Sequence, residues 1–419
     1  MDKHNELAAF ATLLTVVKSS KSRKGSVLII LGGFAGGGSE RTGCWLASSL
    51  HEAGFDVHVT SFVEGSRHDF PLRPGIHIHR RVFRSTKVRS GRYSIAAMGR
   101  GKLQIGSMLL RLTSPLRSAG RWWHIRKVAN AVKPETVLSF GDQLSVETGL
   151  ALLENLSILI VAERSDPRFK PTSILVKALR GPLYRRVPAV VFQTQPVREE
   201  MARRWTLSNS HVIPNAIVDR ASRPLKPLRN RRKDIVMVGR LVPVKNHLAV
   251  IRSWSISKAR NLGWRLLIIG DGPLRDQISN QIAEVRCEDS VVLLGHQSRP
   301  KVWLSNARIF LLPSLWEGFP NALLDAMDTG CACLTSIEGG WGKAILGSNY
   351  PESLVPARDE KAWAQAIDRI VTDLTLADAL GAQASARATL FDQEEILDTW
   401  IRLIRTIERS KVDSDEREG

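Results

Sequence analysis

The sequence has few cysteines and no long apolar run. Four of its 419 residues are cysteine, and none has the paired spacing of a zinc site. Cys331-Ala-Cys333 is one residue too short for a CxxC pair, so we expect reduced thiols in a cytoplasmic protein rather than a disulfide framework. No apolar run approaches the roughly 20 residues that a membrane-spanning helix needs. Leu7–Val17 is apolar, but it follows an acidic residue and precedes no cleavage pattern, so we interpret it as a surface helix rather than a signal peptide.

Acidic residues are also scarce, and one long segment lacks them altogether. The chain has 60 Lys and Arg against 41 Asp and Glu, a formal net charge of +19. Between Asp69 and Glu135 there are fifteen basic residues and no acidic one. Apolar residues, including Trp122 and Trp123, are interleaved with them over 80–133, which we call the basic stretch. This pattern favours binding to an anionic membrane surface or a phosphate-rich acceptor. A solvated basic face and nucleic-acid binding are the alternatives, and no nucleic-acid-binding motif supports the second.

Strand and helix patterns alternate along the rest of the chain. A strand pattern at 26–31, a glycine-rich loop, a helix at 40–53 and a strand at 56–62 predict a parallel α/β sheet. A similar series begins at 234, and 419 residues are too many for one typical core. We therefore predict an N-terminal arm (1–24), a first α/β domain (25–217), a linker (218–233), a second α/β domain (234–390), a C-terminal helix (391–411) and a polar tail (412–419).

The most informative segment is 309–330, where a strand pattern leads into a loop with Glu317. Pro320 is placed at the first position of the following helix, and Asp325 lies eight residues after Glu317. Ligands bind at the carboxyl ends of strands in such sheets, so this carboxylate lies where a ligand is expected. Backbone N–H groups at a helix start favour a phosphate. The expected donors are those of Asn321, Ala322 and Leu323.

Several motifs occur in the order typical of one enzyme family. Residues 239–246, Gly-Arg-Leu-Val-Pro-Val-Lys-Asn, are similar to a G-R-L-x-x-x-K-N loop, and 269–273 to an I-G-x-G-P turn. Glu317 to Asp325 resembles a signature of two glutamates separated by seven residues, and Gly339-Gly340 matches a pair of small residues. In the first half, residues 37–41 resemble a G-G-x-E-R motif and residues 212–215 match a V-I-P-N motif. Over about 26–405 the chain resembles the retaining glycosyltransferase family 4, also called glycosyl transferases group 1.

This resemblance implies the GT-B fold, in which two Rossmann-like domains with parallel sheets face across a cleft. It implies a nucleotide-sugar donor, with UDP favoured, held mainly by the second domain without a metal or cofactor. The C-terminal helix would return to the first domain, and the loop with Gly37 and Gly38 would face the donor diphosphate, where glycines allow close approach. Glu317 would lie near the transferred sugar. Asp325, one methylene shorter than the family's glutamate, would hold the ribose hydroxyls.

The chemistry of such a transfer indicates a role for two basic residues. The leaving nucleoside diphosphate gains negative charge, so a cation must stabilise it. Arg240 and Lys245 lie five residues apart on a loop after a strand, so both can reach one phosphate group. We therefore predict Glu317, Arg240 and Lys245 as catalytic residues, with a solvated surface as the alternative for the basic pair. The predicted donor-binding residues are Gly239, Arg240, Lys245, Gly272, Asn321, Ala322, Leu323 and Asp325.

The first half departs from the family after the strand pattern at 158–161. Many members carry a His there, whereas this chain reads Glu163-Arg164-Ser165-Asp166-Pro167. That form resembles a branch of bacterial enzymes that act on lipid-linked or cell-surface oligosaccharides. Under this resemblance Arg164 would bind a donor or acceptor phosphate and Glu163 would orient a hydroxyl. A structural ion pair is the alternative for both.

These features and the family resemblance together predict a hexosyltransferase, and the resemblance implies that it retains the anomeric configuration. It would move a hexose or N-acetylhexosamine from a UDP-sugar to a lipid-linked oligosaccharide, in the biosynthesis of bacterial surface polysaccharide (exopolysaccharide, capsule, O-antigen or lipopolysaccharide) or of a glycoprotein glycan. We expect a cytoplasmic protein bound peripherally to the anionic inner face of the plasma membrane, with no nucleic-acid partner. Asp325 and the missing His leave two alternatives: a glycan-binding scaffold with a weakened donor site, and a nucleotide-sugar epimerase on the same fold. The sugar, the nucleotide and the linkage depend on a few side chains of the cleft.

Overall fold

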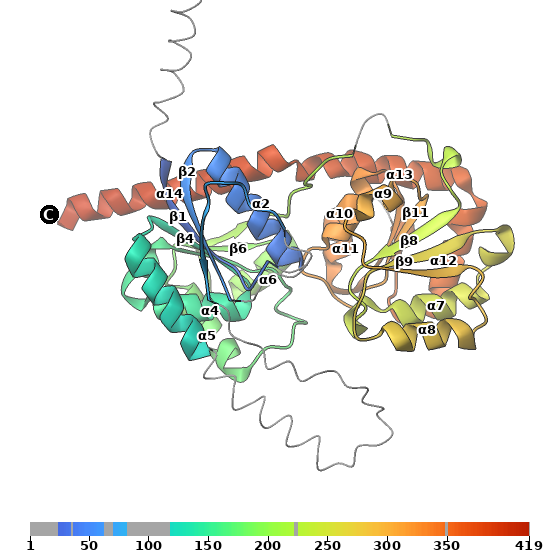
Figure 1. The fold of residues 1–419 in the computed structure, drawn as a ribbon, viewed down its shortest axis with the longest axis horizontal. Coiled ribbons are helices and arrows are strands. Elements are labelled where there is room, and N and C mark those ends of the chain that lie inside the picture. Colours follow the sequence, from blue (N-terminus) through green and yellow to red (C-terminus); the bar gives the residue numbers. More distant parts are fainter. Residues whose placement is uncertain are drawn as a thin grey trace, which may run out of the picture. The chain divides into compact units, whose positions relative to one another are not determined.

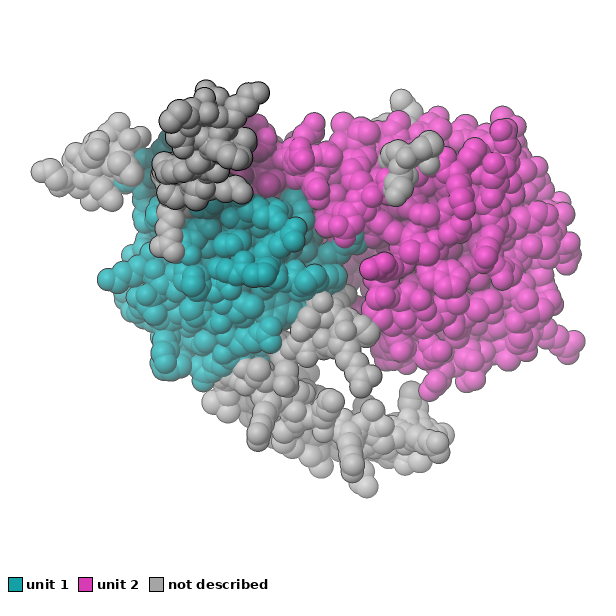
Figure 2. Space-filling model, turned by 45° about the horizontal axis from the view of Figure 1, so that its top comes forward, with its two compact units in different colours: residues 1–140, 147–160, 404–419 teal, residues 141–146, 161–403 magenta. Residues whose placement is uncertain are grey.

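The computed structural model describes residues 24–34, 37–62, 70–81, 118–221, 225–347 and 351–418. Residues 1–23 of the predicted N-terminal arm and residues 82–117 of the basic stretch lie outside these ranges. The described residues form two parallel α/β sheets (Figure 1). They divide into two compact units, which are residues 1–140, 147–160 and 404–419, and residues 141–146 and 161–403 (Figure 2). The predicted domain limits at 217 and 234 differ from this division and stay a prediction.

The first sheet has seven strands in the order β3-β2-β1-β4-β5-β6-β7. The strands are β1 (Lys24–Ile30), β2 (Phe55–Ser61), β3 (His77–Arg80), β4 (Thr136–Phe140), β5 (Leu159–Ala162), β6 (Ala189–Phe192) and β7 (Ser210–Val212). Strands β1, β2 and β5 coincide with the strand patterns that the sequence predicted at 26–31, 56–62 and 158–161. The edge strand β3 was not predicted, because His-Ile-His-Arg is short, polar and largely exposed.

Five described helices accompany this sheet. They are α2 (Gly38–Glu52), the helix of residues 118–132, α4 (Asp142–Ala151), α5 (Ile174–Tyr184) and α6 (Gln195–Trp205). The helix α2 begins two residues before the predicted start. It buries Leu46 and Leu50 completely, which is why its apolar spacing was recognisable.

The second sheet has six strands in the order β10-β9-β8-β11-β12-β13, and its strands pair in parallel. They are β8 (Asp234–Val238), β9 (Arg265–Ile269), β10 (Val291–Gly295), β11 (Ile309–Leu312), β12 (Ala332–Ser336) and β13 (Leu354–Val355). The helices are α7 (His247–Ile256), α8 (Arg275–Glu284), α9 (Pro300–Leu304), α10 (Asn321–Asp328), α11 (Trp341–Leu346), α12 (Glu360–Thr372) and α13 (Leu374–Ala388).

Both faces of the second sheet are buried. Ile235 and Met237 belong to one apolar cluster, whereas Val236, between them on β8, belongs to another. Helices α7, α8 and α12 supply the first cluster, and α10 and α11 supply the second (Figure 1). Burial on both sides explains why these strands are short continuous apolar runs in the sequence. It also leaves the strand ends as the place where polar chemistry can occur.

The last helix, α14 (Gln393–Glu418), runs beyond Lys411, where the sequence analysis ended it. The expected helix end at 411 was wrong, because the backbone stays helical to Glu418. Residues 412–418 contain no glycine or proline to stop a helix. Residues up to 403 belong to one compact unit and those from 404 to the other. Among the described residues, no helix combines the length and apolarity needed to cross a bilayer. All four cysteines are buried.

Candidate functional site

The loops that follow β8, β9 and β11 are hydrogen-bonded to one another. The N–H of Leu241 donates to the carbonyl of Asp271 at 3.0 Å, and that of Leu315 donates to the carbonyl of Val244 at 2.8 Å. The three strands are neighbours in the sheet, so their carboxyl ends meet at one edge. Motifs far apart in the sequence are thus brought together where a ligand is expected.

Two glycines allow this close approach. Gly270 has a φ of +143°, and a Cβ there would lie 1.9 Å from the carbonyl oxygen of Gly239. A Cβ on Gly272 would lie 2.6 Å from the carbonyl oxygen of Leu241. The Gly-Asp-Gly turn therefore lets the β9 loop lie directly against the β8 loop that carries Arg240 and Lys245.

The central contact of this edge is an ion pair between two predicted catalytic residues. The Lys245 ammonium donates to Glu317 Oε1 at 2.6 Å, and the Ser314 hydroxyl donates to the same oxygen at 2.6 Å. The Lys245 and Glu317 side chains are 20% and 13% exposed. Partial burial strengthens the attraction between the charges and still leaves both groups accessible to a ligand.

Asn246 fixes the loop that carries Lys245. Its backbone is left-handed, with φ of 55°, and its side-chain amide donates to the carbonyls of Pro313 and Ala357 at 3.2 and 2.6 Å. The sequence analysis noted Asn246 only as part of a motif and gave Ser314 no role. Arg240 lies on the same loop and is exposed.

The helix start contributes less than the sequence predicted. Pro320 is the residue before α10 rather than its first residue. The N–H of Leu323 donates to the Pro320 carbonyl at 3.0 Å, so this predicted phosphate donor is already engaged. The Asn321 side chain accepts from Asn215 at 2.7 Å, and Asn215 in turn accepts from Gln193 at 2.8 Å. Asn215, the last residue of the V-I-P-N segment, thereby holds the start of α10.

Asp325 is buried and paired, not an exposed helix carboxylate. It is 3% exposed, and its Oδ1 lies 3.5 Å from the ammonium of Lys301. Lys301 also lies 3.1 Å from the Asp328 carboxylate and donates to the carbonyls of Val218 and Asp219. A ribose hydroxyl would therefore share Asp325 with Lys301, a residue that the sequence analysis did not single out.

The loop after β5 lies directly against the loop that contains Glu317. A Cβ on Gly318 would lie 2.4 Å from the carbonyl oxygen of Arg164, and the Arg168 guanidinium donates to the Gly339 carbonyl at 2.6 Å. The Arg164 side chain is buried at 8% exposure, and burial lowers the pKa of its guanidinium to about 9. A charged group in this setting is stabilised by a nearby anion.

Glu163 has the surroundings of a structural residue. It is 1% exposed, and its carboxylate accepts from the Tyr184 hydroxyl at 2.6 Å and lies 3.2 Å from the Arg180 guanidinium. Burial raises the pKa of the Glu163 carboxyl. This geometry fits the structural ion pair that the sequence analysis kept as an alternative.

The first glycine loop ends at the start of α2. Gly37 precedes the helix with extended backbone, and Gly38 is its first residue. A Cβ on Gly37 would lie 1.9 Å from the carboxylate of Glu40, so the side chain of Glu40 occupies the space beside this loop. The position of Gly37 and Gly38 opposite a donor diphosphate stays a prediction.

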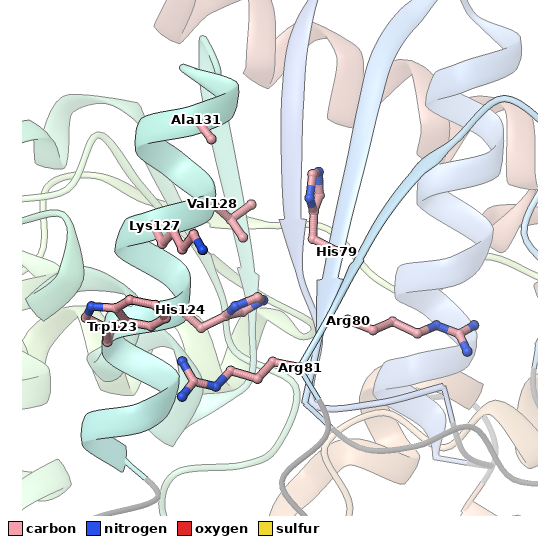
Figure 3. Close-up of a pocket in the computed structure, with 8 residues that line it drawn as sticks. All are labelled: His79, Arg80, Arg81, Trp123, His124, Lys127, Val128 and Ala131. Carbon is pink, nitrogen blue, oxygen red and sulfur yellow. The ribbon is translucent and has the colours of Figure 1, made fainter.

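A basic pocket lies in the described part of the basic stretch (Figure 3). It has a volume of about 320 Å³ and lies between β3 and the helix of residues 118–132. The guanidinium of Arg81 and the ammonium of Lys127 lie 4.9 and 5.3 Å from the ring of Trp123, while Arg80 points away from Arg81. The lining residues are His79, Arg80, Arg81, Trp123, His124, Lys127, Val128 and Ala131.

Comparisons with known proteins agree with the motifs. Residues 219–387 match the family model described as glycosyl transferases group 1. One relative is the N-acetylgalactosamine-N,N'-diacetylbacillosaminyl-diphospho-undecaprenol 4-alpha-N-acetylgalactosaminyltransferase of Campylobacter jejuni, 26% identical over 54% of this chain and 62% of its own length. Another is the UDP-Gal:alpha-D-GlcNAc-diphosphoundecaprenol alpha-1,3-galactosyltransferase of Escherichia coli, 29% identical over 39% of this chain and 44% of its own length. The matched region thus spans less than two thirds of either relative.

The fold has solved counterparts over most of the chain. Sucrose-phosphate synthase from Thermosynechococcus elongatus superposes with a TM-score of 0.70 over 92% of this chain and 100% of that one, at 18% sequence identity. This likeness establishes the fold, and the two parallel α/β sheets are those of the predicted GT-B fold. With the motifs assembled at the carboxyl edge of the second sheet, residues 219–387 are the part of the chain that matches the glycosyl transferases group 1 family.

Proposed function

We propose that this protein is a retaining glycosyltransferase that moves a hexose or N-acetylhexosamine from a UDP-sugar to a lipid-linked oligosaccharide of a bacterial surface glycan. The observation that carries the proposal is the 2.6 Å contact of Lys245 with Glu317 at the carboxyl ends of β8 and β11. The two relatives named above support the acceptor class, because their names refer to diphosphoundecaprenol-linked sugars. One of these names also specifies a UDP-linked donor.

In this mechanism the donor diphosphate binds between the β8 loop and the start of α10. Lys245 and the exposed Arg240 stabilise the charge that develops on the leaving diphosphate, a role that a metal ion fills in other sugar transferases. Glu317 lies beside the transferred sugar and orients Lys245 through their 2.6 Å contact. Ser314 and Asn246 position these two residues without touching the donor.

Nucleotide-sugar binding is the direct test. We expect one UDP-sugar from a panel of UDP-hexoses, UDP-N-acetylhexosamines and GDP-mannose to raise the melting temperature. A ligand at 100 times its Kd adds about 2.7 kcal/mol of stability. Arg240→Gln should weaken the shift, because it removes a phosphate contact, whereas Arg229→Gln should not. No shift with any donor would contradict the proposed donor site.

The pairing of Asp325 with Lys301 favours one alternative function, a glycan-binding scaffold. Because Lys301 engages this carboxylate, the ribose interaction is weaker than with an unshared acid, as a glycan-binding scaffold with a weakened donor site would require. Release of UDP in the presence of a polyprenyl-diphosphate oligosaccharide supports the enzyme. Tight glycan binding without turnover of any nucleotide sugar supports the scaffold. Conversion of the donor without an acceptor indicates an epimerase.

We further propose that the basic pocket faces the anionic membrane surface that carries the acceptor. Arg81 and Lys127 place two positive charges beside Trp123, a combination suited to lipid headgroups. Each basic residue near such a surface contributes roughly 1 kcal/mol. The double variant Arg81→Gln/Lys127→Gln should therefore bind liposomes with anionic lipid about 30-fold more weakly.

A matched control removes the same charge elsewhere. Lys258 and Lys361 are exposed and lie outside the basic stretch, so Lys258→Gln/Lys361→Gln should keep nearly full binding. Liposome sedimentation at two salt concentrations measures both variants, and wild-type binding should fall as salt rises. Equal binding to neutral liposomes at high salt would contradict an electrostatic surface.

A further inference from the structure

A second cluster of chemically reactive side chains lies at the edge of the first sheet. Asp56 and His58 alternate along β2, and their side chains are 21% and 15% exposed. Strand β3 pairs with β2 in parallel, and its His77 is the direct partner of His58. Two positions on one strand and one on its neighbour thus present three polar side chains on the same face of the sheet.

The possible ligand atoms of the three side chains lie close together. Asp56 Oδ1 lies 3.7 Å from His58 Nε2 and 3.7 Å from His77 Nε2. Their potential ligand atoms all lie within 4.8 Å of one another. In a tetrahedral zinc site with bonds of about 2.0–2.1 Å, ligand atoms lie about 3.3 Å apart. The His58 and His77 rings are stacked with centroids 4.6 Å apart, so the exposed His77 ring must rotate before both Nε2 lone pairs point at one ion.

A further histidine orients the ligands. His58 Nδ1 lies 3.0 Å from His79 Nε2, so His58 can donate from Nδ1 and keep the lone pair of Nε2 directed toward Asp56. The carbonyl of His79 accepts from the Thr60 hydroxyl at 2.8 Å, which anchors this residue in turn. Metal-bound histidines characteristically donate their other ring N–H to a carboxylate, a backbone carbonyl or water, and here the His79 ring nitrogen would be the acceptor.

An ion could reach the cluster from solvent. The His77 side chain is 56% exposed, far more than the other two, so one side of the cluster stays open to water. Two imidazole nitrogens and one carboxylate oxygen form a donor set that suits zinc, with water in the fourth position.

We propose that Asp56, His58 and His77 bind one divalent transition-metal ion, with Zn²⁺ as the reference ion and His79 as the positioning residue. The ion would fasten the four-residue edge strand β3 to β2 and so fix Arg80 and Arg81, which line the basic pocket. This site shares no residue with the Glu317 and Lys245 site. The prediction that sugar transfer itself needs no metal is therefore unaffected.

Zinc titration of the untagged full-length chain after chelator treatment tests the site. Calorimetry should give one Zn²⁺ per chain, and Zn²⁺ alone should raise the melting temperature. We expect Asp56→Asn and His77→Ala each to lower the affinity for Zn²⁺ by about 10-fold to 100-fold or more. Each variant should also abolish the thermal shift. His79→Ala, which leaves all three ligands in place, should weaken binding about 10-fold.

A matched histidine variant controls for binding elsewhere. His211 is exposed on β7, so His211→Ala should bind Zn²⁺ like the wild type. Circular dichroism of the metal-free variants shows whether the fold is retained, and Asp56→Asn is the variant least disruptive to it. Substitution with Co²⁺ should give the visible absorption of a tetrahedral site in the wild type and in His211→Ala, but not in Asp56→Asn or His77→Ala. Absence of binding, or equal affinity in Asp56→Asn and His77→Ala, would overturn the proposal.

Discussion

Replacing Lys245 by Met is expected to lower the rate of sugar transfer by about 100-fold to 1000-fold. The ammonium of Lys245 lies 2.6 Å from Glu317, at the strand edge where the donor diphosphate is proposed to bind. Met preserves most of the side-chain volume but removes the charge that stabilises the leaving group. The measurement is UDP release with a polyprenyl-diphosphate oligosaccharide, using the donor that the thermal-shift panel identifies.

The control for this variant is Lys233→Met. Lys233 is an exposed residue at the opposite end of β8, where its ammonium donates to the Leu262 carbonyl at 3.1 Å. It should keep wild-type activity. Circular dichroism and the melting temperature confirm that Lys245→Met is folded. A folded Lys245→Met variant with more than about a third of wild-type turnover would refute the assigned role of the ammonium.

Replacing Gly270 by Ala is expected to destabilise the fold by more than about 4 kcal/mol. The φ of +143° is unfavourable for any residue with a side chain, and the added Cβ would lie 1.9 Å from the Gly239 carbonyl oxygen. The neighbour is backbone, so it cannot rotate away, and the β8 and β9 loops must separate. Urea unfolding, followed by circular dichroism, measures the loss.

Gly263→Ala separates backbone strain from the clash. Gly263 also has a positive φ, of +74°, but a Cβ there would meet no atom within 4 Å. This variant should lose only about 1–2 kcal/mol, the cost of left-handed backbone for a residue with a side chain. Similar losses in the two variants would show that close approach of the loops is not what Gly270 provides.

Much of the fold was predictable because both faces of each parallel sheet are covered. Buried strands such as β8 and β11 are short apolar runs bounded by glycine, proline or charged residues, and such runs are visible in a single sequence. Strand β3 was missed because it is an exposed edge strand held by pairing with β2 rather than by its own apolar residues. The end of α14 was missed because the polar composition of 412–419 suggested disorder although nothing there stops a helix.

The site was predictable where strand order alone determines it. Lys245 and Glu317 follow the neighbouring strands β8 and β11, so their contact follows from the parallel topology. The partners of Asp325 and Glu163 could not be predicted. Lys301 and Arg180 reach them from helices whose rotation depends on packing, which no local pattern encodes. Polar sequence around Glu163 likewise gives no indication that it is 1% exposed.

The ion pair of Lys245 with Glu317 also bears on product release. Under the proposed function, the diphosphate must draw Lys245 away from Glu317 when the donor binds, so part of the binding free energy is used to replace that contact. After transfer, Glu317 competes with UDP for the same ammonium. A carboxylate in this position would shorten the residence time of the spent nucleotide. Slow UDP dissociation in a Glu317→Gln variant, relative to wild type, would be the kinetic signature of that competition.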